Sequence, residues 1–442
     1  MRHALVYLTY NGIYNFTNGI GTQTQLLLGG LEHLQADLAQ VYGPLALHIV
    51  CPQPNATTWG YDAAFWQQQQ QRVAALGGTL HYLPYQAHPD DDLWAVPRWH
   101  ALCAEAARLL ARLCPAYERC LLITIDQPWL HTPLYLARLA PEVFQRVQAL
   151  LVLYSTAFVR NAATPDADER RWEYDGLALA RTAPNVALAD LCPSFTAHVR
   201  EFYQLHDAPF APYTSSILPD EATFTPLALE EVRATLQRYG VPCDRDLVLA
   251  FGRATPLKGF ETLIPALRAI RERCHFVLIS VPYAGETYQQ GYDQLLKAHG
   301  IAATHIRTFT RSLPRALCQW PRTRMVVVPS RQETFSNIPL EVALWARQGG
   351  PVVVASRVGG FNDQITDGVT GFFLDLTSCT AMEQTLHRVL ALSDMAQARI
   401  RAQAYAHVMR HYDFRRNFPA TLRWFWGAPS AHGACDEELT CS

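Results

Sequence analysis

Short apolar runs alternate with longer amphipathic segments along the whole chain. Apolar runs of this length predict buried strands, and the amphipathic segments predict helices that connect them. In the first half the predicted strands are Ala4–Thr9, Leu45–Cys51, Leu80–Leu83, Cys120–Ile125, Leu150–Tyr154 and Val186–Ala189. In the second half they are Leu247–Phe251, His275–Val281, His305–Thr308, Met325–Pro329, Val352–Ala355 and Gly371–Leu374. The pattern predicts an α/β fold in which a parallel sheet with crossover helices occurs twice.

The length of 442 residues also favours two domains, because a single hydrophobic core stops growing at about 250–300 residues. A proline-rich stretch separates the two sets of strands and predicts an interdomain linker. We therefore expect an N-terminal domain over 1–225, a linker over 226–243, a C-terminal domain over 244–405, a helical segment over 406–426 that packs back on the N-terminal domain, and a disordered tail over 427–442.

Charge and cysteine content narrow the class of protein. A net charge of −2 provides no broad positive field for nucleic acid or for an anionic membrane surface. The eleven cysteines form no Cys-x-x-Cys pair, which favours reduced thiols. The apolar stretch Ala4–Tyr10 is too short for the core of a signal peptide, and no apolar run reaches the ~18 residues of a membrane span. We expect a cytoplasmic protein that is not associated with membranes and has no nucleic-acid partner.

Candidate chemistry is concentrated in the segment from Val326 to Glu341. A buried strand is followed by a polar loop and then by a helix that begins near Ser336 and Asn337. A helix start of this kind offers free backbone N–H groups to a phosphate. Glu333 lies before this site and Glu341 within the helix, so both are candidates for accepting hydrogen bonds from sugar hydroxyls. A pair of solvent-exposed glutamates is the alternative.

A second segment places two cations after a strand. Arg253 follows the strand Leu247–Phe251, and Lys258 and Gly259 precede a predicted helix over Phe260–Arg273. Ligands of open α/β sheets bind at the carboxyl ends of strands, where an arginine can hold a diphosphate with two hydrogen bonds. Taken alone, each of these cations would more often be a surface charge.

Together these two segments resemble the family-4 (group 1) glycosyltransferases of GT-B fold, which have two Rossmann-like domains facing a central cleft. The resemblance covers about residues 250–375. It rests on Gly-Arg-x4-Lys-Gly at 252–259, Pro-Ser-x2-Glu-x-Phe-x5-Glu at 329–341, Pro-Val-Val-Val-Ala-Ser-Arg-Val-Gly-Gly at 351–360 and Ile-Thr-Asp-Gly-Val-Thr-Gly-Phe-Phe at 365–373.

The resemblance implies a role for each matching residue. Arg253 and Lys258 would bind the donor diphosphate, with Lys258 near the leaving oxygen. Glu333 would contact the donor sugar, and Glu341 the ribose. The backbone of the loop and helix start would hold sugar and phosphate through Thr334, Phe335, Ser336, Asn337 and Ile338. Ser336 stands where the family usually has glycine, and Val281–Gly285 replaces a glycine-rich turn, so the base and the sugar of the donor stay open.

The first half contributes a glycine pair and the candidate acceptor site. Gly19 and Gly21 match the family's Gly-x-Gly loop, which would face the donor phosphate, although a simple helix-entry turn is the alternative. Thr24 replaces the third glycine of a dinucleotide fingerprint, so NAD binding is not expected. Asp126 occupies a position where many family members have a histidine. It is a candidate contact to the acceptor, and a helix N-cap is the alternative. The other candidate acceptor contacts are Asn11, Tyr14, Asn15, Tyr154 and Ser155.

Metal sites are not indicated. Asp90–Asp92 contains the Asp-x-Asp pattern of metal-dependent glycosyltransferases, but no apolar strand immediately precedes it. No His or Cys spacing suggests zinc.

The sequence therefore predicts a retaining, metal-independent hexosyltransferase that needs no cofactor. It would move a sugar from a nucleotide-diphosphate donor, with UDP-sugar favoured, to a small polar acceptor such as a sugar or a cyclitol. Because Asp126 replaces a histidine with a carboxylate, an amino group on the acceptor is part of this hypothesis. A sugar-nucleotide epimerase, a pyridoxal-phosphate-dependent glycosyl phosphorylase using the spare lysine Lys297, and a non-catalytic sugar-nucleotide-binding regulator are the alternatives.

Overall fold

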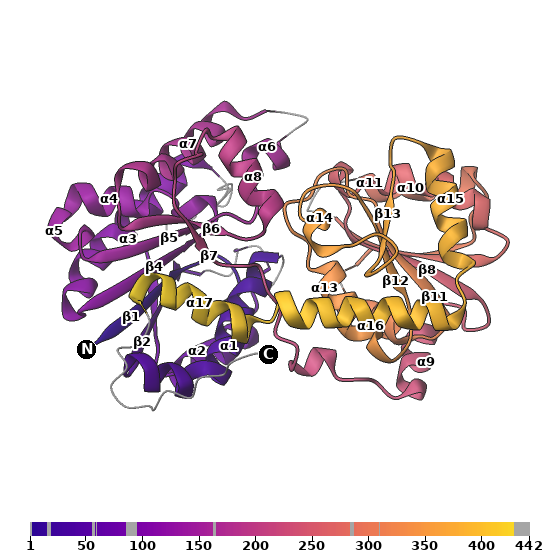
Figure 1. The fold of residues 1–442 in the computed structure, drawn as a ribbon, viewed down its shortest axis with the longest axis horizontal. Coiled ribbons are helices and arrows are strands. Elements are labelled where there is room, and N and C mark those ends of the chain that lie inside the picture. The colour runs from indigo at the N-terminus through magenta and orange to yellow at the C-terminus, as the bar shows by residue number, and fades with distance from the viewer. Residues whose placement is uncertain are drawn as a thin grey trace, which may run out of the picture.

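Two α/β domains, each built on its own parallel sheet, make up the protein (Figure 1). The computed structural model describes residues 2–15, 19–54, 58, 60–84, 95–161, 165–282, 287–308 and 310–427. Most of the segment predicted as a tail, residues 428–442, and the acidic run Asp90–Asp92 lie outside the described residues.

The N-terminal sheet has seven parallel strands in the order β3-β2-β1-β4-β5-β6-β7. Their bounds are β1 His3–Leu8, β2 Leu45–Pro52, β3 Thr79–Leu83, β4 Arg119–Ile125, β5 Val147–Val152, β6 Val186–Asp190 and β7 Phe210–Pro212. The helices of this half are α1 Gly19–Tyr42, α2 Ala63–Ala75, α3 Val96–Leu113, α4 Thr132–Leu139, α5 Pro141–Phe144, α6 Ala157–Arg160, α7 Ala167–Thr182 and α8 Pro193–Phe202.

The C-terminal sheet has six parallel strands in the order β10-β9-β8-β11-β12-β13. Their bounds are β8 Asp246–Arg253, β9 Cys274–Val281, β10 Ala303–Ile306, β11 Thr323–Val328, β12 Val352–Ser356 and β13 Phe372–Leu374. The helices are α9 Leu229–Arg238, α10 Phe260–Ala266, α11 Tyr288–Ala298, α12 Ser312–Gln319, α13 Ile338–Trp345, α14 Phe361–Gln364, α15 Cys379–Leu390, α16 Asp394–His411 and α17 Phe414–Trp426.

Burial of both sheet faces explains why the strands are continuously apolar. In β8, Val248 and Ala250 belong to the core on one face, whereas Leu247 and Leu249 belong to the core on the other. Successive side chains of a strand point to opposite faces, so a sheet covered by helices on both sides needs apolar residues at every position. The predicted two-sheet α/β architecture is confirmed.

Several local predictions differ from the structure. The helix predicted over Phe260–Arg273 ends as α10 at Ala266 and continues as a 3-10 turn, because Pro265 lacks the N–H that an α-helical turn requires. The short edge strand β7 is not among the strands predicted from the sequence. Helix α9, placed in the predicted linker, packs Val232 and Leu236 into the core of the C-terminal domain. In the glutamine run 67–71 of α2, which as a polar run would suit a solvated helix face, Gln69 is buried and accepts a hydrogen bond from Gln25.

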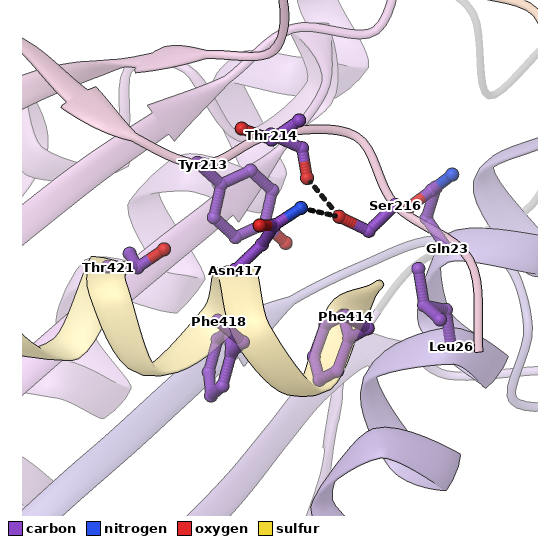
Figure 2. A pocket seen from close by; sticks show the side chains of 9 residues that line it. All are labelled: Gln23, Leu26, Tyr213, Thr214, Ser216, Phe414, Asn417, Phe418 and Thr421. Atoms are coloured by element: carbon purple, nitrogen blue, oxygen red, sulfur yellow. Dashed lines mark hydrogen bonds between the residues drawn. The ribbon is translucent and has the colours of Figure 1, made fainter. Parts of the chain in front are cut away.

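Helix α17 lies on the N-terminal domain although it follows the C-terminal sheet in sequence (Figure 1). Figure 2 shows its side chains against the segment 213–216 and against α1. Asn417 donates from Nδ2 to the Ser216 hydroxyl at 2.8 Å, and the Thr421 hydroxyl donates to the Pro212 carbonyl at 2.6 Å. The chain therefore crosses between the domains twice, once after β7 and once between α16 and α17.

The contact between α1 and α17 depends on a glycine. A Cβ at Gly30 would lie 2.1 Å from the ring of Phe414, so Gly30→Ala must displace this buried ring. We expect a loss of about 1–3 kcal/mol in the free energy of unfolding, measured by urea denaturation. Gly291→Ala is the matched control, because a Cβ at this helical position meets nothing within 4 Å and alanine favours helix. A G30A variant as stable as the wild type would contradict this account of the packing.

Candidate donor and acceptor site

Both sheets reverse their strand order at one point, and the predicted site residues follow the strands at those points. The order reverses between β1 and β4 in the first sheet and between β8 and β11 in the second. In open α/β sheets, ligands bind outside the carboxyl ends of the strands at such a reversal. The loops after β1, β4 and β11 carry Asn11, Asp126 and Glu333, and Arg253 is the last residue of β8.

Lys258 and Glu333 form an ion pair between the loops after β8 and β11. Lys258 Nζ lies 2.5 Å from Glu333 Oε2, and the Ser330 hydroxyl donates to the same oxygen at 3.4 Å. Both side chains are largely buried, with 16% and 12% exposed. Shielding from water strengthens the attraction between the two charges, so the pair is held firmly in place.

Gly259 allows these two loops to approach. Its φ is +65°, which disfavours residues with a side chain, and a Cβ there would lie 2.1 Å from the Pro329 carbonyl oxygen. Arg331 donates its backbone N–H to the Leu257 carbonyl at 2.8 Å, and this hydrogen bond is a second contact between the loops after β8 and β11. The Lys-Gly sequence therefore places the ammonium of Lys258 against the end of β11.

Arg253 ends β8 and is exposed. Its positive charge acts on Tyr10, across the boundary between the domains. Burial raises the pKa of Tyr10 well above its usual value, and Arg253 is among the cations that lower it. Because Tyr10 follows β1 of the N-terminal domain, Arg253 and the first loop lie at the same interface between the domains.

The start of α13 differs from the predicted cap. Asn337 is the N-cap residue but makes no side-chain capping bond, and the Ser336 hydroxyl instead accepts a hydrogen bond from the Ile338 N–H at 3.3 Å. Ser336 is further held by Gln364, which donates to its carbonyl at 2.6 Å. Thr334 and Ser336 are buried, and Phe335 packs against Tyr412 with ring centroids 5.8 Å apart.

Glu341 lies in the first turn of α13. Burial raises its pKa to about 7, Arg311 lowers it, and the neighbouring Glu221 raises it. This glutamate is therefore close to half protonated at neutral pH and can both accept and donate hydrogen bonds.

Asp126 adopts an unusual backbone conformation, with a φ of +67° that is rare outside glycine. Its side chain is buried and accepts hydrogen bonds from the Tyr154 N–H at 3.0 Å and from the Tyr10 hydroxyl at 3.4 Å. It does not cap the 3-10 turn that follows. Burial raises the pKa of Asp126 to about 7, and Arg160 opposes the shift.

A buried cluster of charged side chains lies near Asp126, and the sequence did not predict it. Arg160 pairs with Glu169 and, at 3.1 Å, with Glu173. Glu173 also accepts hydrogen bonds from Gln127 and from the Ala157 N–H. Nothing in the local sequence pattern around Glu173 distinguishes it from an exposed helix residue.

The remaining acceptor candidates are less exposed than loop residues usually are. Asn11, Tyr14 and Asn15 are 4%, 2% and 4% exposed. Tyr154 and Ser155 follow β5 and are half-buried, and the Tyr154 hydroxyl donates to Gln23 at 3.3 Å. This hydrogen bond ties the end of β5 to helix α1.

Gly19 and Gly21 lie in the first turn of α1 rather than in a loop, because the helix begins at Gly19. A Cβ at Gly19 would meet nothing within 4 Å, so the helix start is open there. Within the described residues, no group of three or more His, Cys, Asp or Glu side chains could hold a metal ion. No helix in that part of the chain is long and apolar enough to cross a membrane.

Comparison with known proteins identifies the C-terminal domain. Residues 232–407 match the family described as glycosyl transferases group 1. The D-inositol 3-phosphate glycosyltransferase of Salinispora arenicola is 30% identical over 236 residues, which are 50% of this chain and 51% of that protein. The enzyme of the same name from Acidothermus cellulolyticus is 27% identical over 274 residues, or 59% of this chain and 58% of its own. The chain thus matches little more than half the length of these relatives.

Solved structures extend the likeness of fold to both domains. Sucrose-phosphate synthase from Thermosynechococcus elongatus superposes with a TM-score of 0.70 at 16% identity, covering 96% of this chain and 97% of that one. Anabaena Alr3699/HepE in complex with UDP-glucose superposes with a TM-score of 0.66 at 14% identity, covering 95% and 99%.

The two facing parallel-sheet domains have the GT-B fold, and within that fold residues 232–407 match the group 1 glycosyltransferases.

Proposed function

We propose that this protein is a retaining hexosyltransferase that moves a sugar from a UDP-sugar to a hydroxyl group of a small polar acceptor. The observation that carries the proposal is the ion pair of Lys258 and Glu333 at the strand-order reversal of the second sheet, beside the start of α13. A cation and a carboxylate held together suit a ligand that has a diphosphate next to a hydroxyl-rich sugar.

In the proposed reaction, Lys258 and Arg253 stabilise the negative charge that grows on the leaving diphosphate. Fixed cations in a partly dry site do this without reorganisation, and they can supply the positive charge that a metal would otherwise provide. We therefore propose that the reaction requires neither a metal nor a cofactor. Glu333 would accept hydrogen bonds from the sugar, and Glu341 from the ribose.

UDP is the favoured nucleotide. The Anabaena protein of similar fold is solved in complex with UDP-glucose, which supports a UDP-sugar donor. The phosphorylase alternative loses support, since Lys297, the lysine it would need, is exposed near the end of α11.

The acceptor is proposed as a sugar or cyclitol, and the relatives named for D-inositol 3-phosphate favour the cyclitol. The hypothesis of an amino group on the acceptor loses its original basis. Asp126 is buried, accepts two hydrogen bonds and lies in the field of Arg160, so it does not require an ammonium partner from the substrate.

The first test of the proposal is the stereochemistry of transfer in the presence of EDTA. With UDP-glucose and a panel of sugars and cyclitols, NMR of the product should show the anomeric configuration of the donor. An inverted product, or activity that returns only with Mg²⁺ or Mn²⁺, contradicts retention or metal independence. Conversion of the donor without any acceptor would indicate an epimerase, and binding without turnover a regulator.

The second test separates the roles of Lys258 and Glu341. Lys258→Ala should lower kcat by about 10²–10³ with a smaller effect on UDP binding, because charge on the leaving oxygen increases toward the transition state. Glu341→Ala should instead raise the donor KM, since ribose contacts change little during reaction. Steady-state kinetics and calorimetric UDP titration measure both effects. Wild-type kinetics in both variants would place the site elsewhere.

The third test concerns the protonation of Asp126. Its pKa in the folded protein, about 7, lies above the ordinary value of 3.8, so the folded state binds this proton more tightly than the unfolded chain. The resulting contribution to stability is complete below pH ~4 and is lost as the pH rises toward 7.

Asp126→Asn keeps the hydrogen-bonding shape but cannot titrate. The free energy of unfolding of the variant relative to the wild type should therefore increase between pH 4 and pH 8, by about 1–4 kcal/mol. Urea denaturation at several pH values measures this difference, and the titration of Glu341 cancels because both proteins contain it. A difference that is constant with pH, or that decreases, would show that Asp126 is ionised throughout.

A further inference from the structure

The loop that carries Glu333 makes direct contact with the N-terminal domain through the next residue. The Thr334 hydroxyl donates a hydrogen bond to the carbonyl of Tyr154, which follows β5. The Cys192 thiol, before α8, donates to the Thr334 carbonyl at 3.8 Å. Thr334 is 6% exposed, so water does not compete strongly for these bonds.

Tyr154 connects this contact to the acceptor side. Its N–H donates to Asp126 Oδ1 at 3.0 Å, and its hydroxyl donates to Gln23 of α1 at 3.3 Å. One residue thus holds the candidate acceptor carboxylate through its N–H and the donor loop through its carbonyl. A hydrogen-bonded path runs from Asp126 through the backbone of Tyr154 to Thr334.

The loop that carries Glu333 is also packed tightly against the rest of the C-terminal domain. It therefore cannot move with the N-terminal domain alone. A Cβ at Gly359 would lie 1.6 Å from the Glu333 carbonyl oxygen, and one at Gly360 would lie 2.5 Å from that of Thr334. Gly360 also donates its N–H to the Thr334 carbonyl at 3.2 Å. The turn before α14 therefore backs the loop closely, and Glu333 is fixed between this turn and Lys258.

A second contact between the domains lies nearby but does not involve the donor loop. The Ser194 N–H donates to Asp363 Oδ2 at 2.9 Å. This contact joins the start of α8 to α14. Removal of the Thr334 hydroxyl leaves this contact and the bond from Cys192 to the Thr334 carbonyl in place, so it is expected to loosen the interface without unfolding it.

From this arrangement we propose that Thr334 is a positioning residue that holds the two domains closed over the donor. Its hydroxyl couples closure to the placement of Glu333, and thereby of Lys258, while its own side chain does not bind substrate. The inference rests on the proposed function for the identity of the donor, but the closure itself depends only on the contacts between the domains.

The test compares Thr334→Val, which keeps the shape and removes the hydroxyl, with Thr334→Ser, which keeps the hydroxyl. Thr385→Val is the matched control, because the Thr385 hydroxyl also donates to a backbone carbonyl, at 3.1 Å, but within α15 and away from the interface. Thermal unfolding confirms that each variant is folded.

Small-angle X-ray scattering of the nucleotide-free proteins should give a larger radius of gyration for T334V than for the wild type, T334S and T385V. Hydrolysis of UDP-glucose, with water as acceptor, should show a kcat about fivefold lower for T334V, as expected when one hydrogen bond is removed from the closed state. The dissociation constant of UDP, measured by calorimetry, should change less than twofold, because UDP contacts the C-terminal domain in either state.

Equal radius of gyration and equal kcat in T334V and the wild type would overturn the inference. A parallel loss of UDP affinity and kcat would also overturn it, since this would indicate local damage to the donor site. If the wild type neither binds UDP nor hydrolyses UDP-glucose, the proposed donor is wrong, and the scattering comparison still decides whether Thr334 controls closure.

Discussion

The site depends on the parallel arrangement of both sheets, which brings the carboxyl ends of all strands to one edge of each domain. At these edges the strand order reverses, between β1 and β4 and between β8 and β11. Helices cover both faces of the second sheet, so polar groups can gather only beyond the strand ends. The contact of Thr334 with Tyr154 and the influence of Arg253 on Tyr10 indicate that the two edges face each other.

Charge is distributed unequally between these edges. The C-terminal edge carries the cations Arg253 and Lys258, and Lys258 pairs with Glu333. The N-terminal edge carries Asp126, whose pKa burial raises to about 7, so it can be neutral when a ligand arrives. Under the proposed function, a diphosphate would lie on the cationic side of the interface and a neutral hydroxyl compound on the other, without two like charges being forced together.

The sequence predicted the part of the candidate site in the C-terminal domain better than the part in the N-terminal domain. Gly252–Gly259 and Pro329–Glu341 are continuous segments, so turn, strand and helix signals fix their residues relative to one another. The acceptor side instead joins Tyr10, Asp126, Tyr154 and Arg160, whose contacts arise only through tertiary packing. For this reason the two-sheet fold and the position of Lys258 could be predicted, whereas the burial of Asp126, its partners and the interdomain bond of Thr334 could not.

Closure of the two domains must be compatible with the two chain crossings. These crossings are bonded to each other: Ile217 donates its N–H to the Tyr412 carbonyl at 2.8 Å and accepts one from Phe414 at 3.0 Å. Arg415 pairs with Asp413 at 2.7 Å and also with Asp220, joining the same two segments again. Because these bonds join the two crossings, we expect the crossings to act as a single hinge rather than as two independent tethers. Under the proposed role of Thr334, a rotation about that hinge would be opposed where the domains meet at this residue, so that one hydroxyl would bias the balance between open and closed forms.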